Sequence, residues 1–148
     1  MENPKDYGFN SQLIHYSGHH DAFGAATVPI YQTSTFAFES AQDGADCFAG
    51  VKPGYMYTRI GNPTVKALER QVALLEHACD SVAVASGMAA VSTVYLGLLN
   101  AGDHVVSSSA VYGASRVLME QHMSRFGVES TYVNTANLDE VKAAMRPN

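Results

Sequence analysis

A serine-glycine pair, Ser86-Gly87, stands where an apolar, β-branched run ends and a helical pattern begins. Glycine lets the backbone come close to a ligand, and the free N–H groups of a first helical turn, with the positive end of the helix dipole, favour an anion such as phosphate. The segment Ala85-Ser86-Gly87-Met88-Ala89-Ala90 is therefore a candidate phosphate cup. Taken alone, these residues are explained more simply by a tight turn without a ligand.

Two common phosphate-binding motifs do not occur in the sequence. The three spaced glycines of a dinucleotide fingerprint are missing, and so is the Gly-Lys-Ser/Thr of a P-loop. Tyr57 and Arg59 could complete an anion site, because a guanidinium binds phosphate oxygens bidentately and a phenol adds a hydroxyl donor. Alternatively, both residues are polar side chains that simply face solvent.

A third segment that could meet a ligand is Tyr112-Gly113, which follows a predicted strand. An aromatic ring at the carboxyl edge of a sheet could lie over a flat cofactor. By itself, Tyr112 is more simply explained as a tyrosine of the core or of its rim.

Regular elements that could position these residues are predicted from Asn62 onwards. Asn62 can cap a helix and Pro63 suits its first position, while Val65, Leu68 and Val72 repeat at helical spacing. Strands are expected at residues 81–86, 104–108 and 128–133, and helices at residues 87–100, at 115–126 with Met119, Met123 and Phe126 on one face, and from Asn137. Strands that alternate with helices predict an α/β fold with a parallel sheet covered by helices.

Residues 1–61 are expected to form an extended N-terminal arm, because Gly, Pro, Thr and Tyr are spread through them without a sustained helical period. An extended segment rarely buries itself. Its aromatic residues, such as Phe36 and Phe48, are therefore expected to pack on a partner subunit or on another part of the protein. A partly disordered leader is the alternative.

Composition excludes several classes of protein. The 148 residues carry a net charge of −5 and no basic run, so nucleic acid is not an expected partner. The N-terminus lacks the basic start and apolar stretch of a signal peptide, and no apolar run approaches the roughly 20 residues that cross a bilayer. A cytoplasmic protein without membrane partners is expected, with Cys47 and Cys79 as ordinary thiols.

Taken together, these segments resemble the Cys/Met-metabolism family of pyridoxal-phosphate (PLP) enzymes. That family includes methionine gamma-lyase, cystathionine gamma-lyase, cystathionine gamma-synthase and O-acetylhomoserine sulfhydrylase. The resemblance rests on runs spread over nearly the whole chain: Val28-Pro29-Ile30-Tyr31-Gln32-Thr33-Ser34-Thr35-Phe36, Tyr57-Thr58-Arg59-Ile60-Gly61-Asn62-Pro63-Thr64, Leu68-Glu69, Leu75-Glu76, Ser86-Gly87-Met88-Ala89-Ala90, Gly102-Asp103-His104, Tyr112-Gly113 and Phe126-Gly127-Val128-Glu129.

The resemblance implies a fold and a cofactor site. The fold is the large domain of a fold type I, aspartate-aminotransferase-like PLP enzyme, with residues 62–148 as its truncated first half. Ser86 and the amides of Gly87 and Met88 would hold the PLP phosphate. Tyr112 would stack on the pyridine ring and act as acid or base near the leaving group. Tyr57 and Arg59 would reach the phosphate site of a neighbouring subunit in a homotetramer.

The resemblance also implies a lysine that forms a Schiff base with PLP, and none of the four lysines matches it. Lys5 lies in the leader, Lys52 in a Gly/Pro loop, Lys66 in the first turns of a helix and Lys142 on an amphipathic helix. The chain alone is therefore expected to be inactive, and the remainder of the enzyme is an expected partner.

The implied reaction is γ-elimination or γ-replacement on a sulfur amino acid or an O-acyl-homoserine. The runs Asp46-Cys47-Phe48-Ala49-Gly50 and Gly54-Tyr55-Met56-Tyr57 look most like methionine gamma-lyase. Ala114 departs from the family, because lyases usually carry cysteine there and synthases and sulfhydrylases glycine. O-acetylhomoserine sulfhydrylase and cystathionine gamma-synthase remain alternatives, and so does a non-catalytic fragment that only binds a phosphate ligand or a partner subunit.

Overall fold

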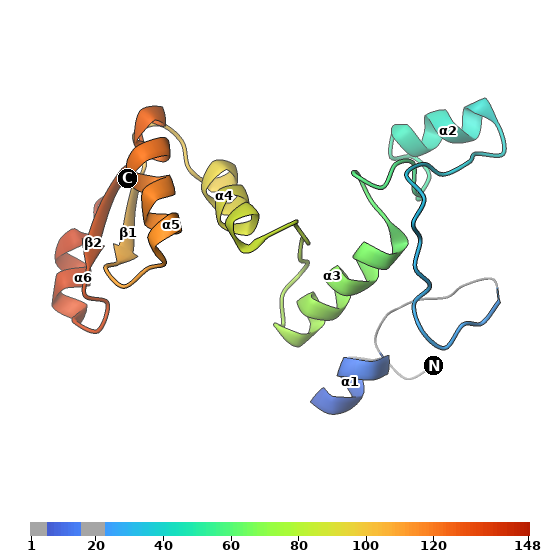
Figure 1. Cartoon of the computed structure of the whole chain (residues 1–148), viewed down its shortest axis with the longest axis horizontal. Coiled ribbons are helices and arrows are strands. Elements are labelled where there is room, and N and C mark those ends of the chain that lie inside the picture. The colour runs from blue at the N-terminus through green and yellow to red at the C-terminus, as the bar shows by residue number, and fades with distance from the viewer. Residues whose placement is uncertain (1–5, 16–22) are drawn as a thin grey trace. The chain divides into compact units, whose positions relative to one another are not determined.

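A computed structural model describes residues 6–15 and 23–148 of the chain, which forms two compact units, Met1–Ala83 and Val84–Asn148 (Figure 1). Each unit is described by itself. The expected division between an arm and a domain after residue 61 stays a prediction. Among the described helices none is long and apolar enough to cross a membrane.

The first unit is built on helix α3 (Pro63–Leu75), which begins as the sequence predicts. The side chain of Asn62 accepts a hydrogen bond from the Thr64 N–H at 2.9 Å, and Pro63 occupies the first helical position. The apolar residues that repeat at helical spacing along α3 are not its buried residues. Leu68 is 56% exposed, whereas Ala67 and Ala73 are buried, because small side chains let other segments approach the helix closely.

Two short helices lie in the segment that was expected to be extended throughout. Helix α1 (Phe9–His15) contacts α3, and the amide of Gln71 donates to the carbonyl of Gln12. Helix α2 (Ala41–Phe48) is capped by Ser40, whose Oγ accepts from the Asp43 N–H at 3.1 Å. These short helices interrupt the extended conformation expected for residues 1–61, because local capping satisfies the first N–H groups of α2; the arm itself and its contact with a partner subunit stay predictions.

Residues 34–36 of the arm pair with residues 56–58. Thr35 and Tyr57 form an isolated antiparallel bridge, flanked by hydrogen bonds from Phe36 N–H to Met56 at 3.1 Å and from Thr58 N–H to Ser34 at 2.9 Å. Aromatic rings also pack within this unit, in the pairs Phe36–Tyr55 and Phe38–Phe48.

The second unit contains a small parallel sheet with helices, as the sequence predicts. Strand β1 (His104–Ser108) pairs with β2 (Glu129–Val133), with His104 opposite Glu129 and Ser108 opposite Val133. Helix α4 (Gly87–Leu98) precedes β1, α5 (Gly113–Val117) follows it, and α6 (Leu138–Ala144) follows β2 (Figure 1). The side chain of Asn137 caps α6 by accepting from the Asp139 N–H at 3.1 Å.

The expected strand at residues 81–86 is wrong. In the part of the chain that the structure describes, only β1 and β2 pair as strands, so residues 81–86 have no ladder to join. The Ala83 N–H instead donates to the Glu69 carboxylate at 2.9 Å, and the Ser81 hydroxyl donates to the Glu69 carbonyl at 2.7 Å. Val82 is 74% exposed.

The helix that begins with α5 changes its winding along its length. A π-helical turn (Leu118–His122) and a 3-10 turn (Met123–Phe126) follow α5 directly. The core of this unit lies beneath them and consists of Met119, Met123 and Val128, with Tyr95, Leu99 and Val105 packed against it.

Phe126 is not part of this core, contrary to the predicted helix face, and is 64% exposed. The helix ends in a Schellman motif: Gly127 has φ +81°, its N–H donates to Ser124 at 3.0 Å, and the Val128 N–H donates to Met123 at 3.3 Å. This turn sends Val128 back over Met123, so Val128 fills the core position expected for Phe126.

Candidate functional site

The candidate phosphate cup is the N-terminus of α4. Ser86 is extended (φ −162°, ψ 163°), and its Oγ accepts from the Ala89 N–H at 3.1 Å. In the described part of the chain the N–H groups of Gly87 and Met88 have no acceptor. Two backbone donors at the positive end of a helix dipole form a site for an anion.

Gly87 leaves open space in this cup. A Cβ built on Gly87 would meet nothing within 4 Å, and its φ lies outside the left-handed range. The fold of the chain therefore places no demand for glycine at this position. Space beside two free N–H groups suits the close approach of a ligand oxygen.

Tyr112 lies between β1 and α5, as the sequence predicts. It is the N-cap residue of α5, and its carbonyl accepts from the Arg116 N–H at 3.1 Å. Its side chain forms no capping hydrogen bond and is 72% exposed. An exposed ring at this place can stack on a planar ligand.

The structure brings the cup and the Tyr112 helix into contact. Ser115, on α5, is 5% exposed, and its hydroxyl lies 3.8 Å from the sulfur of Met88, in the first turn of α4. Helices α4 and α5 therefore contact each other next to both candidate segments. This contact was not expected from the sequence.

Tyr57 and Arg59 belong to the other unit, where they pair with each other. The guanidinium carbon of Arg59 lies 5.1 Å from the centre of the Tyr57 ring, and both residues are exposed. A cation over an aromatic face is an attractive arrangement. It holds the fork of Arg59 beside the phenol, as a shared anion site would require.

Two of the lysines are held by carboxylates. The ammonium of Lys66 donates to Asp80 at 3.1 Å and lies 3.3 Å from Glu69, and the hydrogen bond to Asp80 above all raises the pKa of Lys66. A hydrogen bond to Asp43 raises the pKa of Lys52 in the same way. A raised pKa keeps an amine protonated, which makes both lysines poor nucleophiles.

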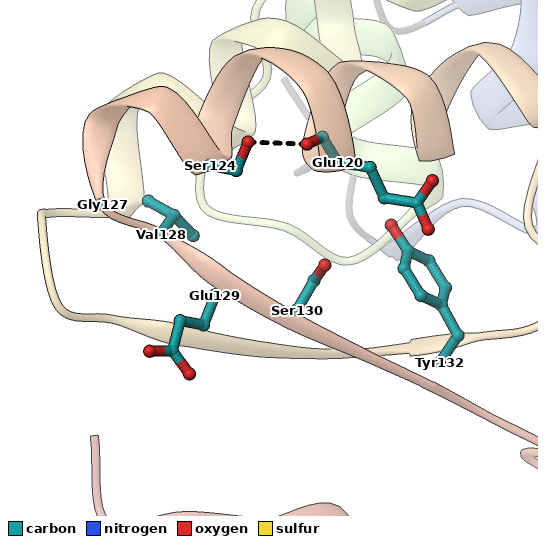
Figure 2. Close-up of a pocket in the computed structure, with 7 residues that line it drawn as sticks. All are labelled: Glu120, Ser124, Gly127, Val128, Glu129, Ser130 and Tyr132. Atoms are coloured by element: carbon teal, nitrogen blue, oxygen red, sulfur yellow. Dashed lines mark hydrogen bonds between the residues drawn. The ribbon is translucent and has the colours of Figure 1, made fainter.

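A hollow in the second unit lies away from every predicted site residue. It is formed between β2 and the helical segment before it (Figure 2). The Tyr132 hydroxyl beside it is buried and has no hydrogen-bond partner among the described residues. The Arg116 guanidinium covers the Tyr132 ring at 4.3 Å and pairs with Glu120 at 2.8 Å. Across the described ranges 6–15 and 23–148, no group of His, Cys, Asp and Glu could hold a metal ion.

The second unit thus combines a parallel α/β arrangement with two free N–H groups at the start of α4 and an exposed aromatic ring at the start of α5. The chain belongs to the Cys/Met metabolism PLP-dependent enzyme family, whose model matches residues 10–148. The expected family and its cofactor, PLP, are thereby confirmed.

Relatives in this family have related activities. The chain is 47% identical over 144 residues to L-methionine gamma-lyase of Fusobacterium nucleatum subsp. polymorphum, covering 97% of this chain and 36% of the relative. It is 38% identical over 148 residues to O-acetyl-L-homoserine sulfhydrylase of Corynebacterium glutamicum, covering 99% of this chain and 34% of the relative. The chain thus spans about a third of the length of the relatives it matches.

Solved structures confirm the expected fold class, part of the large domain of a fold type I PLP enzyme. One is a putative O-acetylhomoserine (thiol)-lyase of Campylobacter jejuni with N'-pyridoxyl-lysine-5'-monophosphate at position 205. The match has a TM-score of 0.86 and 28% sequence identity, and it covers 95% of this chain and 35% of that one.

Proposed function

We propose that this chain supplies the phosphate-binding part of a PLP enzyme that eliminates or replaces the γ-substituent of a sulfur amino acid or an O-acyl-homoserine, most like methionine gamma-lyase. The observation that carries the proposal is the open cup of α4, with free N–H groups at Gly87 and Met88, in contact through Ser115 with the helix that Tyr112 begins. Membership of a PLP-dependent family supports it.

The residues of the cup hold the cofactor phosphate. The N–H groups of Gly87 and Met88 would donate to its oxygens, and Ser86 keeps the turn in place by capping α4. PLP, when bound, supplies an electron sink for the negative charge that develops on the substrate. The exposed ring of Tyr112 would lie against the cofactor, and its hydroxyl would be the group that holds or moves a proton near the substrate's γ-substituent.

Tyr57 and Arg59 serve a second copy of the site. Both side chains are exposed and lie against each other, so the pair can donate to a phosphate presented by a neighbouring subunit. Each site is then shared between two subunits, and two such dimers form a tetramer. Exposed apolar residues on α4, including Leu96 and Leu98, agree with a surface that further polypeptide covers.

The lysine that binds PLP covalently comes from outside this chain. Lys52 and Lys66 are protonated and held by carboxylates, and Lys142 stands exposed on α6. We therefore expect the chain by itself to be inactive and the active enzyme to be assembled in the cytoplasm with the remaining part of the protein.

Gamma-lyase activity is favoured over sulfhydrylase activity. The identity to the Fusobacterium methionine gamma-lyase is 47%, against 38% to the Corynebacterium sulfhydrylase. Ala114, beside Tyr112, matches neither the cysteine usual in the lyases nor the glycine usual in the sulfhydrylases, so the choice needs an assay.

The test begins with the intact mass and the visible absorbance spectrum of the protein isolated from its native source. A second polypeptide, or a longer one, with a yellow cofactor that borohydride reduces would support the proposal. Assays with methionine and with O-acetylhomoserine plus sulfide would then separate lyase from sulfhydrylase. A single colourless species of 15.8 kDa that does not bind added PLP would refute it and favour a non-catalytic fragment.

A further inference from the structure

Ser115 is a buried polar residue beside the candidate site, and the function proposed above uses its contact with Met88 but gives the side chain no role of its own. It is 5% exposed and lies on the first turn of α5, three residues after Tyr112. A buried hydroxyl needs a hydrogen-bond partner, and the partner of Ser115 is the sulfur of Met88 at 3.8 Å. A thioether is a weak acceptor, so packing alone does not explain a polar residue here.

Met88 is held by two hydroxyls that act differently. The Ser92 hydroxyl donates to the Met88 carbonyl at 2.7 Å within α4, whereas the Ser115 hydroxyl reaches the Met88 side chain from α5. The first interaction supports the helix, and the second joins two helices. Ser92 and Ser115 both contact Met88, so Ser92 can serve as the control for a substitution of Ser115.

The contact links two segments that would hold opposite ends of one ligand. The N–H of Met88 is one of the two donors for the phosphate, and Tyr112 begins the helix that carries Ser115. A rigid ligand that is bound at both ends binds more tightly when the protein holds its two contact points at the separation that the ligand requires, because both contacts can then form at once.

We propose that Ser115 is a positioning residue that sets the separation between the phosphate cup and the ring of Tyr112. The inference rests on the proposed function, since it assumes that PLP occupies both. Ser115 acts through Met88 and touches neither the cofactor nor the substrate. Removal of the Ser115 hydroxyl should therefore change the orientation of the cofactor ring more than the stability of the fold.

The test compares Ser115→Ala with Ser92→Ala and with Met88→Leu, alone and combined with Ser115→Ala, in the protein expressed from its complete gene. The dissociation constant for PLP is measured by fluorescence, and the seating of the cofactor ring by its visible circular dichroism band. Thermal unfolding of each apoprotein is recorded in parallel, so that a loss of fold is seen separately.

Ser115→Ala is expected to weaken PLP binding about 2- to 5-fold, less than the loss of an ordinary hydrogen bond because the thioether is a weak acceptor, and to reduce the dichroism band. Ser92→Ala should leave both unchanged. Met88→Leu should remove the effect of Ser115→Ala, because the sulfur that the hydroxyl contacts is gone. Unchanged binding and dichroism in Ser115→Ala, or additive effects in the double variant, would overturn the inference. Failure of the unmodified protein to bind PLP would refute the proposed function, and the inference with it.

Discussion

Replacement of Gly87 by alanine separates a structural role for this glycine from a ligand-binding role. Gly87 has an ordinary helical backbone, and a Cβ there meets nothing within 4 Å. The alanine therefore costs no strain and should stabilise the chain by about 0.4–1 kcal/mol, because it restricts the unfolded state. The added methyl group would occupy space that a phosphate needs. Crowding of about 1–3 kcal/mol corresponds to roughly 5- to 150-fold weaker PLP binding.

The assay is PLP titration followed by urea unfolding of the apoprotein, with Gly97→Ala as the control. Gly97 lies in the same helix, away from the cup, and a Cβ there also meets nothing within 4 Å. Gly97→Ala should raise stability by up to about 1 kcal/mol and leave PLP affinity unchanged. If Gly87→Ala bound PLP as tightly as the unmodified protein, the assignment of the phosphate to this turn would be refuted.

Three further substitutions test other parts of the molecule. Gly127→Ala should destabilise the chain by about 1–3 kcal/mol in urea unfolding, because φ is +81° and the new Cβ would lie 3.2 Å from Ala101; an unchanged midpoint would contradict this. Tyr112→Phe should keep PLP binding and lower kcat about 100-fold or more, and an unchanged kcat would remove its proton-transfer role. The hydrogen bond from Lys66 lowers the pKa of Asp80 in the folded chain. The pair therefore stabilises the fold at pH values above the pKa of Asp80 in the unfolded chain, and this stabilisation is lost as the pH falls through the pKa of Asp80 in the folded chain. The Tm of Asp80→Asn should therefore fall less than the Tm of the unmodified protein between pH 7 and about pH 3. An equal fall in Tm would count against a stabilising Lys66–Asp80 pair.

Elements that begin with a capping residue were the easiest to predict from the sequence. Asn62, Ser86 and Asn137 each accept a backbone hydrogen bond at the start of the expected helix. Ser40 caps α2 in the same way, with Asp43 as donor, so the signal for that helix was present in a segment interpreted as extended.

The errors have a common physical cause, which is dependence on non-local partners. Residues 81–86 have the composition of a strand, but a strand exists only beside another, and Glu69 binds the N–H of Ala83 instead. Phe126 has the right helical spacing for the core, but the turn at Gly127 gives that place to Val128. Neither outcome can be read from local spacing.

The positions of the candidate residues at the starts of two helices were predictable, and their connections were not. Ser86, Gly87, Met88 and Tyr112 follow from a family motif and lie at the starts of α4 and α5, although the strand expected before Ser86 is absent from the described part of the chain; their roles in binding stay predictions. The contact between Ser115 and Met88 joins residues that are 27 positions apart and depends on how α5 lies against α4. No sequence pattern specifies that packing.

The parallel pairing of β1 and β2 through one intervening helix has a consequence for the order of events during synthesis. Every residue of the core cluster, from Tyr95 to Val128, lies within a short stretch of the chain, and the two strands are complete at Val133. Short sequence separations favour fast folding, and ribosomes deliver the chain from its N-terminus. This unit can therefore acquire its core soon after Val133 leaves the ribosome, with α4 already attached to the core through Tyr95 and Leu99. The cup at the start of α4 then folds together with this core, whose contacts all join residues close in the sequence.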